Sequence, residues 1–339
     1  MIIKVVLKNF RLKYTFKIAF QTYLFIKYLA YLQGMKTVLI TGGSGMLGNY
    51  LTSFLQQNNY TVHWLSRKKI ESSSHQLKIF QWDVEKQFID ISVFENVDYI
   101  IHLAGAGIAD KPWTEEYKKV IIHSRVDSAK LLIKYIVENS LPIKKFIGAS
   151  AVGIYGMKID EQEYTEESAY GNDFLADVCK QWEREYLPLI DQNYPCAVLR
   201  IGLILSHTGG LYKQLVPIFK WGLGSALGSG KQYMPWIHIE DLCNMILYLM
   251  EHSEITGTFN ATSGEYINNY DFSKKLAKSL NAPFFLPNIP EFLLYLIFGD
   301  QYKMLTTGLK ISNQKIKEKG FHFKFENLDD ALQDLKIKL

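Results

Sequence analysis

Cysteine is scarce in this chain of 339 residues, which contains only Cys179, Cys196 and Cys243. The three are far apart and form no Cys-x-x-Cys pair, so the pattern excludes a disulfide framework and gives no sign of a zinc site. Unpaired cysteines are typical of a reducing compartment. We therefore expect a cytoplasmic protein without a bound metal.

Acidic residues are missing from residues 1–34, which carry six cationic side chains: Lys4, Lys8, Arg11, Lys13, Lys17 and Lys27. The whole chain has 38 Lys and Arg against 34 Asp and Glu, so its formal net charge of +4 comes from this segment. The remainder is slightly acidic and offers no nucleic-acid surface. With 48% hydrophobic and 21% charged residues, the chain has the composition of one to two globular domains.

A long apolar run is also missing. The run from Ile18 to Leu32 is broken by Gln21 and Lys27, which makes it short for a membrane span, and no secretory cleavage site follows it. Three interpretations of residues 1–34 stay open: translation from a start upstream of Met35, an amphipathic segment on a membrane surface, or an anchor or targeting signal. We expect this N-terminal extension to be dispensable and the core to have no membrane contact.

Glycine is concentrated in one stretch, Thr41-Gly42-Gly43-Ser44-Gly45-Met46-Leu47-Gly48. It follows the apolar run Thr37–Ile40, which reads as a buried strand, and precedes Leu51–Gln56, which reads as a helix. Gly42 permits the turn, Gly45 admits a pyrophosphate and Gly48 lets the helix approach the sheet. The spacing alone is a weak indication, but strand, glycine turn and helix in this order predict a dinucleotide-binding site.

Apolar runs alternate with helical stretches from Met35 onward, a pattern typical of an α/β fold with a doubly wound parallel sheet. We expect the first strand to begin after Met35. The predicted strands are Thr37–Thr41, Thr61–Ser66, Leu77–Asp83, Asp98–Ala104, Lys145–Ala149, Ala197–Ile201 and Thr258–Asn260.

The end of the second predicted strand is basic, with Arg67 and Lys68 about where an NAD-specific fold places an acid on the ribose. Cations there suit a 2′-phosphate, so NADP is preferred over NAD. Asp83 ends the third strand and is a candidate acceptor for the adenine amino group. The predicted cofactor-binding residues are Gly42, Ser44, Gly45, Met46, Leu47, Gly48, Arg67, Lys68, Asp83, Leu103, Ala104 and Gly105.

Several motifs together carry a family resemblance. The glycine turn, His102–Ala106 and Ser150–Gly156 resemble extended short-chain dehydrogenases of the nucleotide-sugar epimerase/dehydratase group. Further stretches resemble one atypical branch of this group, whose members are labelled epimerase-family or cell-division-inhibitor-like proteins: residues 111–114, 124–126, 171–176, 222–232 and 236–241. Residues 286–332 resemble the small C-terminal domain of that branch, which has no assigned role. The resemblance implies a Rossmann domain over residues 35–280 and a smaller substrate-side domain over residues 281–339.

The resemblance also indicates which residues of the usual catalytic set this chain lacks. A typical member uses a Tyr, a Lys four residues later and a Ser or Thr that orients the substrate. Here the tyrosine position is Tyr170, but Phe174 occupies the lysine position. The serine position falls on Ala151, with Ser150 one residue earlier, and strand alternation would turn Ser150 to the other face. Ser150 and Tyr170 are the catalytic candidates, although each also has an ordinary structural interpretation.

Cationic and aromatic residues in the second half of the chain predict a substrate cleft. Arg200 ends a strand, Lys231 lies in the glycine loop 228–232, and Trp236 follows it. This combination suits an anionic or nucleotide-linked ligand. By contrast, Asp241 is expected to cap a helix over Leu242–Met250, and Cys243 is expected to be buried.

Two functions remain open on this sequence. One is an NADP-dependent oxidoreductase or epimerase-like enzyme that acts on an unidentified small molecule. The other is a regulator that binds NADP without turnover, for example in cell division. The missing lysine favours the regulator, and the predicted cleft favours the enzyme. The oligomeric state is left open.

Overall fold

The computed structural model describes residues 34–68 and 74–338. The N-terminal extension predicted over residues 1–34 therefore lies outside the described residues, except for Gly34. At the centre is an eight-stranded sheet with the order β11-β8-β6-β5-β1-β2-β3-β4, parallel throughout except for β4 at the edge. The strands are β1 (Thr37–Thr41), β2 (Thr61–Ser66), β3 (Leu77–Asp83), β4 (Phe88–Ile89), β5 (Val97–His102), β6 (Lys145–Ala151), β8 (Cys196–Ile201) and β11 (Gly257–Ala261).

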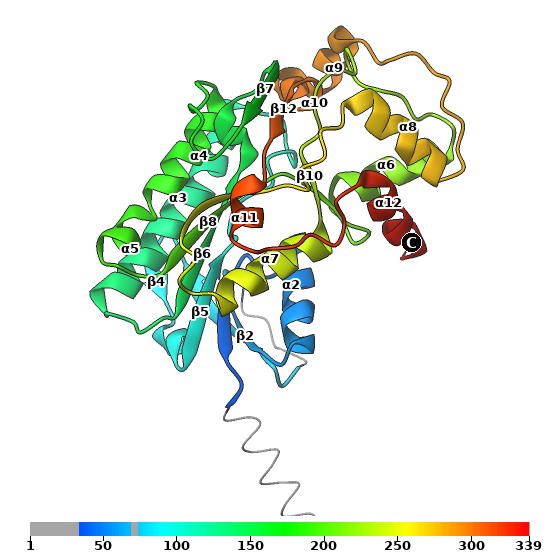
Figure 1. Cartoon of the computed structure of the whole chain (residues 1–339). Coiled ribbons are helices and arrows are strands. Elements are labelled where there is room, and N and C mark those ends of the chain that lie inside the picture. Colours follow the sequence, from blue (N-terminus) through cyan, green and yellow to red (C-terminus); the bar gives the residue numbers. More distant parts are fainter. Residues whose placement is uncertain (1–33, 69–73, 339) are drawn as a thin grey trace, which may run out of the picture.

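Helices cover both faces of the sheet, as the sequence predicts for a doubly wound α/β fold (Figure 1). One face packs against α2 (Met46–Gln57) and α7 (Ile239–Glu251). The other packs against α3 (Glu115–Glu138), α4 (Phe174–Arg184) and α5 (Leu187–Asp191). β1 pairs with β2 along one of its edges and with β5 along the other edge. Such a reversal of strand order opens a crevice at the carboxyl edge of the sheet, where ligands bind.

The predicted strands match the observed ones closely, because each is an apolar run that the helices cover. β1, β2 and β3 have the predicted bounds, whereas β5 ends at His102 rather than Ala104. The first helix begins at Met46, five residues earlier than predicted. Glycine is needed at residue 48 of this helix, because a Cβ atom there would lie 2.3 Å from the carbonyl oxygen of Gly42. The glycine thus allows the first helical turn to form directly against the turn.

Two small strand pairs were not predicted. β9 (Leu203–Leu205) pairs with β10 (Trp236–His238), and β7 (Ile159–Tyr164) pairs with β12 (Gly308–Ile311), parallel in both cases. They are short, and their partners are distant in the sequence. Further helices are α6 (Gly210–Lys220), α8 (Asn269–Ser279), α10 (Tyr302–Thr306), α11 (Gln314–Glu318) and α12 (Leu328–Ile337). 3-10 turns lie at Ile91–Phe94, Val152–Tyr155 and Gly299–Gln301.

The C-terminal segment is attached to the rest of the chain at several points. The buried carboxylate of Asp241 in α7 accepts hydrogen bonds from the backbone N–H groups of Lys324 (2.8 Å) and Phe325 (2.9 Å). The Asn260 side chain donates to the carbonyl oxygen of Ser312 at 3.0 Å. α12 packs into one apolar cluster with α6 and α8. Residues 281–338 therefore share their core with the preceding part of the chain.

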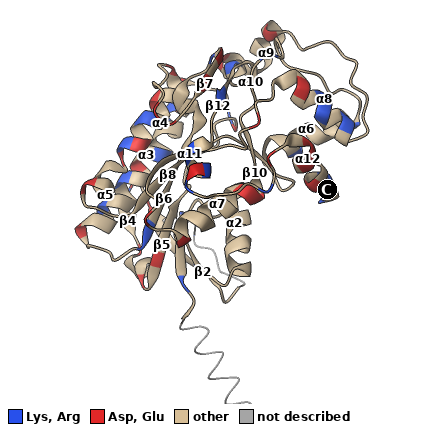
Figure 2. Cartoon of the chain, in the orientation of Figure 1, with Lys and Arg blue, Asp and Glu red and all other residues tan. Residues whose placement is uncertain are grey.

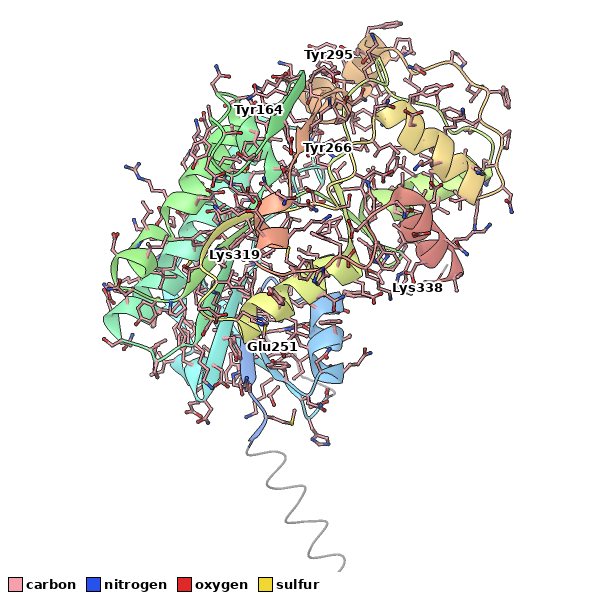
Figure 3. The ribbon with its side chains drawn as sticks, viewed as in Figure 1. Tyr164, Glu251, Tyr266, Tyr295, Lys319 and Lys338 are labelled. Atoms are coloured by element: carbon pink, nitrogen blue, oxygen red, sulfur yellow. The ribbon has the colours of Figure 1, made fainter. Side chains whose placement is uncertain are left out.

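Helix α9 (Glu291–Phe298) is apolar along most of its length. Only Leu294 is buried, and Leu296 and Ile297 remain 74% and 71% exposed. Tyr295 marks the helix in Figure 3, at the opposite end of the molecule from the start of β1. Just beyond α9, the Gln301 side chain donates to the carbonyl oxygens of Ile108 (3.1 Å) and Lys111 (2.6 Å), which ties this region to the loop after β5.

Candidate functional site: a glycine turn at the carboxyl edge of the sheet

The glycine turn between β1 and α2 is closely packed. Gly42 has φ = +72°, and a Cβ atom there would lie 2.8 Å from the carbonyl oxygen of Leu103. The N–H group of Gly45 donates to the carbonyl oxygen of Gly42 at 3.0 Å. Ser44 and Gly45 are exposed at the tip of the turn. The turn thus presents bare backbone to a ligand while its base contacts the end of β5.

The N-terminus of α2 lacks a side-chain cap. Among the other described helices, α3, α4, α7, α8 and α12 each have one, from Thr114, Asp173, His238, Asn268 and Asn327 respectively. α2 begins instead at Gly45, which offers no side chain, and the helix contains no charged residue, as its uniform colour in Figure 2 shows. The first N–H groups of α2 are therefore available to an anion, which the helix dipole also favours.

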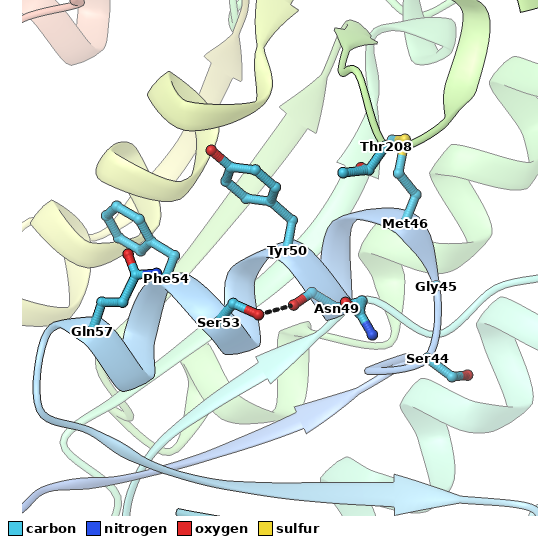
Figure 4. Close-up of a pocket in the computed structure, with 9 residues that line it drawn as sticks. All are labelled: Ser44, Gly45, Met46, Asn49, Tyr50, Ser53, Phe54, Gln57 and Thr208. Atoms are coloured by element: carbon cyan, nitrogen blue, oxygen red, sulfur yellow. Dashed lines mark hydrogen bonds between the residues drawn. The ribbon is translucent and has the colours of Figure 1, made fainter. Parts of the chain in front are cut away.

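A second helix with an uncapped glycine start lies beside α2. α6 begins after Gly209, and a Cβ atom on Gly209 would lie 3.0 Å from Cγ of Met46. A cavity of about 360 Å³ runs from the glycine turn along α2 to Thr208 (Figure 4). Its lining is neutral, polar and aromatic: Ser44, Gly45, Met46, Asn49, Tyr50, Ser53, Phe54, Gln57 and Thr208. Two helix N-termini and a cavity thus adjoin the same turn.

A buried hydrogen-bond network fixes the strand ends next to the turn. The Thr41 hydroxyl oxygen accepts from the N–H groups of Leu103 and Ala104, both at 3.2 Å, and lies 2.8 Å from Nδ1 of His102. Because this oxygen accepts twice, its proton is donated to Nδ1. Burial lowers the pKa of His102 to about 3 and keeps the ring neutral. The predicted residues Leu103, Ala104 and Gly105 are thereby held beside the turn.

The predicted adenosine-side residues lie at neighbouring strand ends. Arg67 and Lys68 are both exposed just after β2. Asp83 is engaged locally, because Oδ1 accepts from the Lys86 N–H group at 3.1 Å and Oδ2 pairs with the Lys86 ammonium at 3.1 Å. These hydrogen bonds lower the pKa of the Asp83 carboxyl. The contacts of these residues with a cofactor stay predictions.

The two catalytic candidates do not touch each other. The Ser150 side chain is buried, and its hydroxyl donates to Oε1 of Glu183 at 2.6 Å. Tyr170 is 51% exposed, and its hydroxyl oxygen accepts from Nη2 of Arg200 at 3.2 Å. The Arg200–Glu183 pair links the two residues. Their catalytic roles stay predictions, and for Ser150 the hydroxyl would first have to leave Glu183.

The sequence predicts that Arg200 contacts the substrate, but in the structure its side chain is bound to other groups of the protein. Its side chain is 2% exposed, and all five N–H groups have acceptors within the protein. Nε and Nη2 donate to the two oxygens of Glu183, each at 2.9 Å. The remaining donors reach the hydroxyls of Tyr155 and Tyr170 and the carbonyl oxygen of Glu166. Burial opposes the charge, but the pair with Glu183 outweighs it and raises the pKa of Arg200.

The other two substrate candidates, Trp236 and Lys231, differ in exposure. Trp236 is fully buried in the cluster around Tyr212 and Phe272, so it faces the core and not the cleft that the sequence predicts. Lys231 is exposed in its glycine loop, where a ligand can reach it. The structure therefore leaves only Lys231 accessible among the three predicted substrate residues.

Phe174, which the resemblance places at the position of the usual lysine, makes an aromatic contact. The Phe174 ring packs edge-on against Trp113 at 5.1 Å, and the Lys118 ammonium lies 5.7 Å from the Phe174 ring centroid. Lys180, which could have served as a replacement, donates to the carbonyl oxygen of Gly171 at 3.2 Å. The cation that reaches Tyr170 is Arg200, from a strand and not from the helix.

Asp241 does not cap its helix, which corrects the expectation. α7 begins at Ile239, and the cap is His238, whose Nδ1 accepts from the N–H group of Glu240 at 3.2 Å. Asp241 lies in the first turn and binds the backbone of the C-terminal segment instead. Burial raises the pKa of its carboxyl, against the effect of these two hydrogen bonds. Cys243 is buried, as expected.

One group of potential metal ligands occurs among the described residues. Ligand atoms of His238, Glu240 and Asp334 lie within 4.8 Å of one another. Both carboxylates are already paired, Glu240 with Lys324 at 2.7 Å and Asp334 with Lys338 at 2.6 Å. Two ammonium groups at the site oppose a further cation, so the residues do not favour a metal. Figure 3 labels Lys338 on α12, next to this group.

Arg125 is a residue that sequence reasoning missed as a site residue. It belongs to a resemblance motif, but its importance depends on tertiary placement. In the structure its guanidinium carbon lies 3.0 Å from where a Cβ atom of Gly105 would be, and 5.3 Å from the Trp182 ring centroid.

Known protein families cover most of the chain. Residues 38–261 match the NAD dependent epimerase/dehydratase family, and residues 289–335 match a domain of unknown function, DUF1731. The chain belongs to the NAD dependent epimerase/dehydratase family. The epimerase family protein YfhF of Bacillus subtilis is 32% identical over 299 residues, 88% of this chain and 97% of that protein. An epimerase family protein of Staphylococcus aureus N315 is 33% identical over 302 residues, 89% and 99% of the two chains.

Solved structures of this epimerase/dehydratase family share the fold. The human epimerase family protein SDR39U1 (isoform 2), solved with NADPH, has a TM-score of 0.79 at 27% identity and covers 89% of this chain and 100% of its own. A nucleoside-diphosphate sugar epimerase from Corynebacterium glutamicum has a TM-score of 0.70 at 26% identity, covering 93% of this chain and 63% of its own. These relatives confirm the predicted resemblance to atypical short-chain dehydrogenases and an NAD(P)-binding Rossmann fold. In the described part of the chain, no helix meets the length and hydropathy that a membrane span requires.

Proposed function

We propose that this protein is an NADP(H)-dependent oxidoreductase or epimerase-like enzyme that acts on a small anionic or nucleotide-linked molecule. The observation that carries the proposal is the uncapped N-terminus of α2 behind an exposed glycine turn, at the point where the strand order reverses. A helix start without its own cap leaves N–H groups for a pyrophosphate. The free, buried cysteines support the reducing, cytoplasmic compartment that we propose for it.

The preference for NADP over NAD rests on Arg67 and Lys68. Both are exposed after β2, the strand next to the glycine turn. A 2′-phosphate beside them would gain charge-assisted hydrogen bonds, and arginine can bind it through two N–H groups. The NADPH in the human relative SDR39U1 supports the same preference.

Replacement of Arg67 tests this preference. We expect Arg67→Ala to weaken NADPH binding roughly tenfold to hundredfold and to leave NADH binding nearly unchanged, because one charged hydrogen bond contributes about 1.5–3 kcal/mol. Titrations followed by NAD(P)H fluorescence would measure both affinities. Lys78→Ala, which removes an exposed cation at the other end of β3, is the matched control. Equal weakening of both cofactors, or tighter NADH binding by the parent protein, would contradict the assignment.

The substrate side of the proposal rests on the second uncapped helix, α6, and on the exposed Lys231. Both favour negatively charged groups. NADP(H), when bound, supplies the hydride chemistry of such an enzyme. The chain itself would orient the substrate, with the half-exposed Tyr170 hydroxyl as the candidate proton donor.

The alternative is a protein that binds NADP(H) without turnover and regulates a partner. It is favoured by Phe174 at the lysine position and by the Ser150 hydroxyl, which is bound to Glu183. A panel of carbonyl compounds and nucleotide sugars, incubated with the purified protein and NADPH, distinguishes the two. Oxidation of NADPH with any one compound supports the enzyme, and tight NADPH binding without turnover across the panel supports the regulator.

A further inference from the structure

We propose that Arg125 forms an anion-binding position at the carboxyl edge of the sheet, beside Gly105, which takes a carboxylate or phosphate group of a bound ligand. The proposal deepens the proposed function, because it places a charge-selective contact next to the predicted dinucleotide site. It rests on the position of the guanidinium and on its lack of an anionic partner among the described residues.

The position of Arg125 depends on the glycine at residue 105. Arg125 lies in α3, and its Cγ, Nε and Cζ atoms approach within 3.1, 3.2 and 3.0 Å of where a Cβ atom of Gly105 would be. On its other side the guanidinium lies over the Trp182 ring. Gly105 is exposed three residues after β5, the strand that pairs with β1. The guanidinium is therefore held flat at the edge where the glycine turn also opens.

The donors of Arg125 are largely unused. Nη1 donates to the carbonyl oxygen of Ile121, one turn earlier in α3, at 3.1 Å. Within residues 34–68 and 74–338 it has no other hydrogen-bond acceptor and no ion pair, which leaves four N–H groups for a ligand. The ionisable groups that act on its charge are the thiol of Cys179 and the phenols of Tyr117 and Tyr186. None of these is an anion near neutral pH, since burial or desolvation raises the pKa of each.

The charge of Arg125 is therefore not compensated by the protein. Burial lowers the pKa of its guanidinium, in contrast to Arg200. A charge withdrawn from water is normally paired, because desolvation is costly. An anionic ligand would recover that cost, and the planar fork of arginine fits a carboxylate or phosphate. The side chain is only partly buried, so a ligand can reach it.

The anion has two possible sources, the phosphates of the dinucleotide or an acidic group of the substrate. A direct experiment compares the parent protein with Arg125→Gln, which removes the charge at similar length. The control is Arg184→Gln, which removes an exposed arginine from α4. Binding of NADPH is followed by its own fluorescence. Binding of inorganic phosphate, with and without saturating NADPH, is followed by tryptophan emission, and Trp182→Phe identifies the signal of the ring under Arg125.

The expected results separate the two sources. If the cofactor supplies the anion, Arg125→Gln weakens NADPH binding at least tenfold, and phosphate competes with NADPH. If the substrate supplies it, NADPH affinity changes less than threefold, and phosphate binds the NADPH complex of the parent but not of Arg125→Gln. Unchanged binding of both probes in Arg125→Gln would overturn the proposal. Failure of the parent to bind NADPH, with phosphate binding still dependent on Arg125, would contradict the proposed function only.

Thermal unfolding without ligand excludes a merely structural role. An uncompensated cation that serves a ligand costs stability, so we expect the melting temperature of Arg125→Gln to equal or exceed that of the parent. A cation needed for folding would give the opposite result, a melting temperature several degrees lower. Such a loss, together with unchanged phosphate binding, would show that Arg125 only supports the packing of α3 on α4.

Discussion

Arg200 and Arg125 both approach the carboxyl edge of the sheet, but the protein treats the two guanidinium groups in opposite ways. Arg200 is almost fully buried, and all its donors have acceptors in the protein, two of them on Glu183. Among the residues that the structure describes, Arg125 is partly exposed and has one acceptor, a carbonyl group of its own helix. Burial acts against the charge of both, but within the same described residues only Arg200 has a carboxylate to oppose it. A paired cation organises its surroundings, whereas an unpaired one is free to bind a ligand.

The largest effect that this comparison predicts follows from breaking the Arg200 pair. Arg200→Met leaves the largely buried Glu183 carboxylate without its cation and removes a donor from Tyr155 and Tyr170. We expect a loss of about 3–5 kcal/mol in the free energy of unfolding, measured by denaturant titration. Arg184→Met is the control for loss of an exposed arginine.

A double variant sharpens this result. Arg200→Met combined with Glu183→Leu removes both charges, so it should regain part of the stability that Arg200→Met alone loses. A loss below about 1 kcal/mol in the single variant would show that the pair contributes little, and the contrast with Arg125 would then disappear.

A smaller effect concerns His102, a buried imidazole that the fold keeps neutral. The pKa of His102 is lowered from 6.5 to about 3, so below pH 6.5 the unfolded chain takes up a proton that the folded protein does not. This contribution to stability is present above pH 6.5 and is lost as the pH falls toward 3. At pH 5 the loss is about 2 kcal/mol. His238, with a pKa lowered to about 4, acts in the same direction.

Denaturant titrations at pH 7 and pH 5 measure this loss, with His102→Asn as the comparison, because Asn can still accept from Thr41 but does not titrate. The variant should lose less stability between the two pH values than the parent. Equal losses in the two proteins would mean that the ring of His102 does not stay neutral within the fold.

The smallest effect concerns Tyr170, the exposed end of the Arg200 network. Tyr170→Phe removes one acceptor from Arg200 at a half-exposed position, so we expect about 0.5–1.5 kcal/mol loss of stability. On any substrate that the panel identifies, we expect turnover to fall less than about tenfold, because no lysine and no free serine hydroxyl complete the usual set. Tyr266→Phe, at a similarly exposed tyrosine that binds Glu163, is the control. A loss of a hundredfold or more with unchanged NADPH affinity would identify Tyr170 as the general acid.

The sequence predicted those parts of the fold that local patterns determine. The bounds of β1, β2 and β3 follow from continuous or alternating apolar runs, and the glycine turn follows from its spacing. β7 was missed because its mostly polar sequence, Ile159–Tyr164, becomes a strand only by pairing with β12 from a distant part of the chain. Pairing of this kind has no local signal.

The candidate site was harder to predict, because the role of a charged residue depends on its partners. Arg200 and Trp236 have the residue types of a ligand site, yet both are buried among partners from other elements. Asp241 lies where a cap is plausible, but the segment around Lys324 and Phe325 takes its carboxylate. Arg125 was missed for the converse reason, since its lack of an anionic partner among the described residues is visible only in the folded chain.

The attachment of the C-terminal segment has a consequence for how the protein unfolds. Asp241 and Asn260, within the part that matches the epimerase/dehydratase family, hold backbone groups of residues 324, 325 and 312, within the part that matches DUF1731. Separation of the two parts would leave a buried carboxylate without its donors and would expose the cluster that α12 shares with α6 and α8. We therefore expect the two family modules to unfold as one cooperative unit, in a single thermal transition and not as two independent pieces.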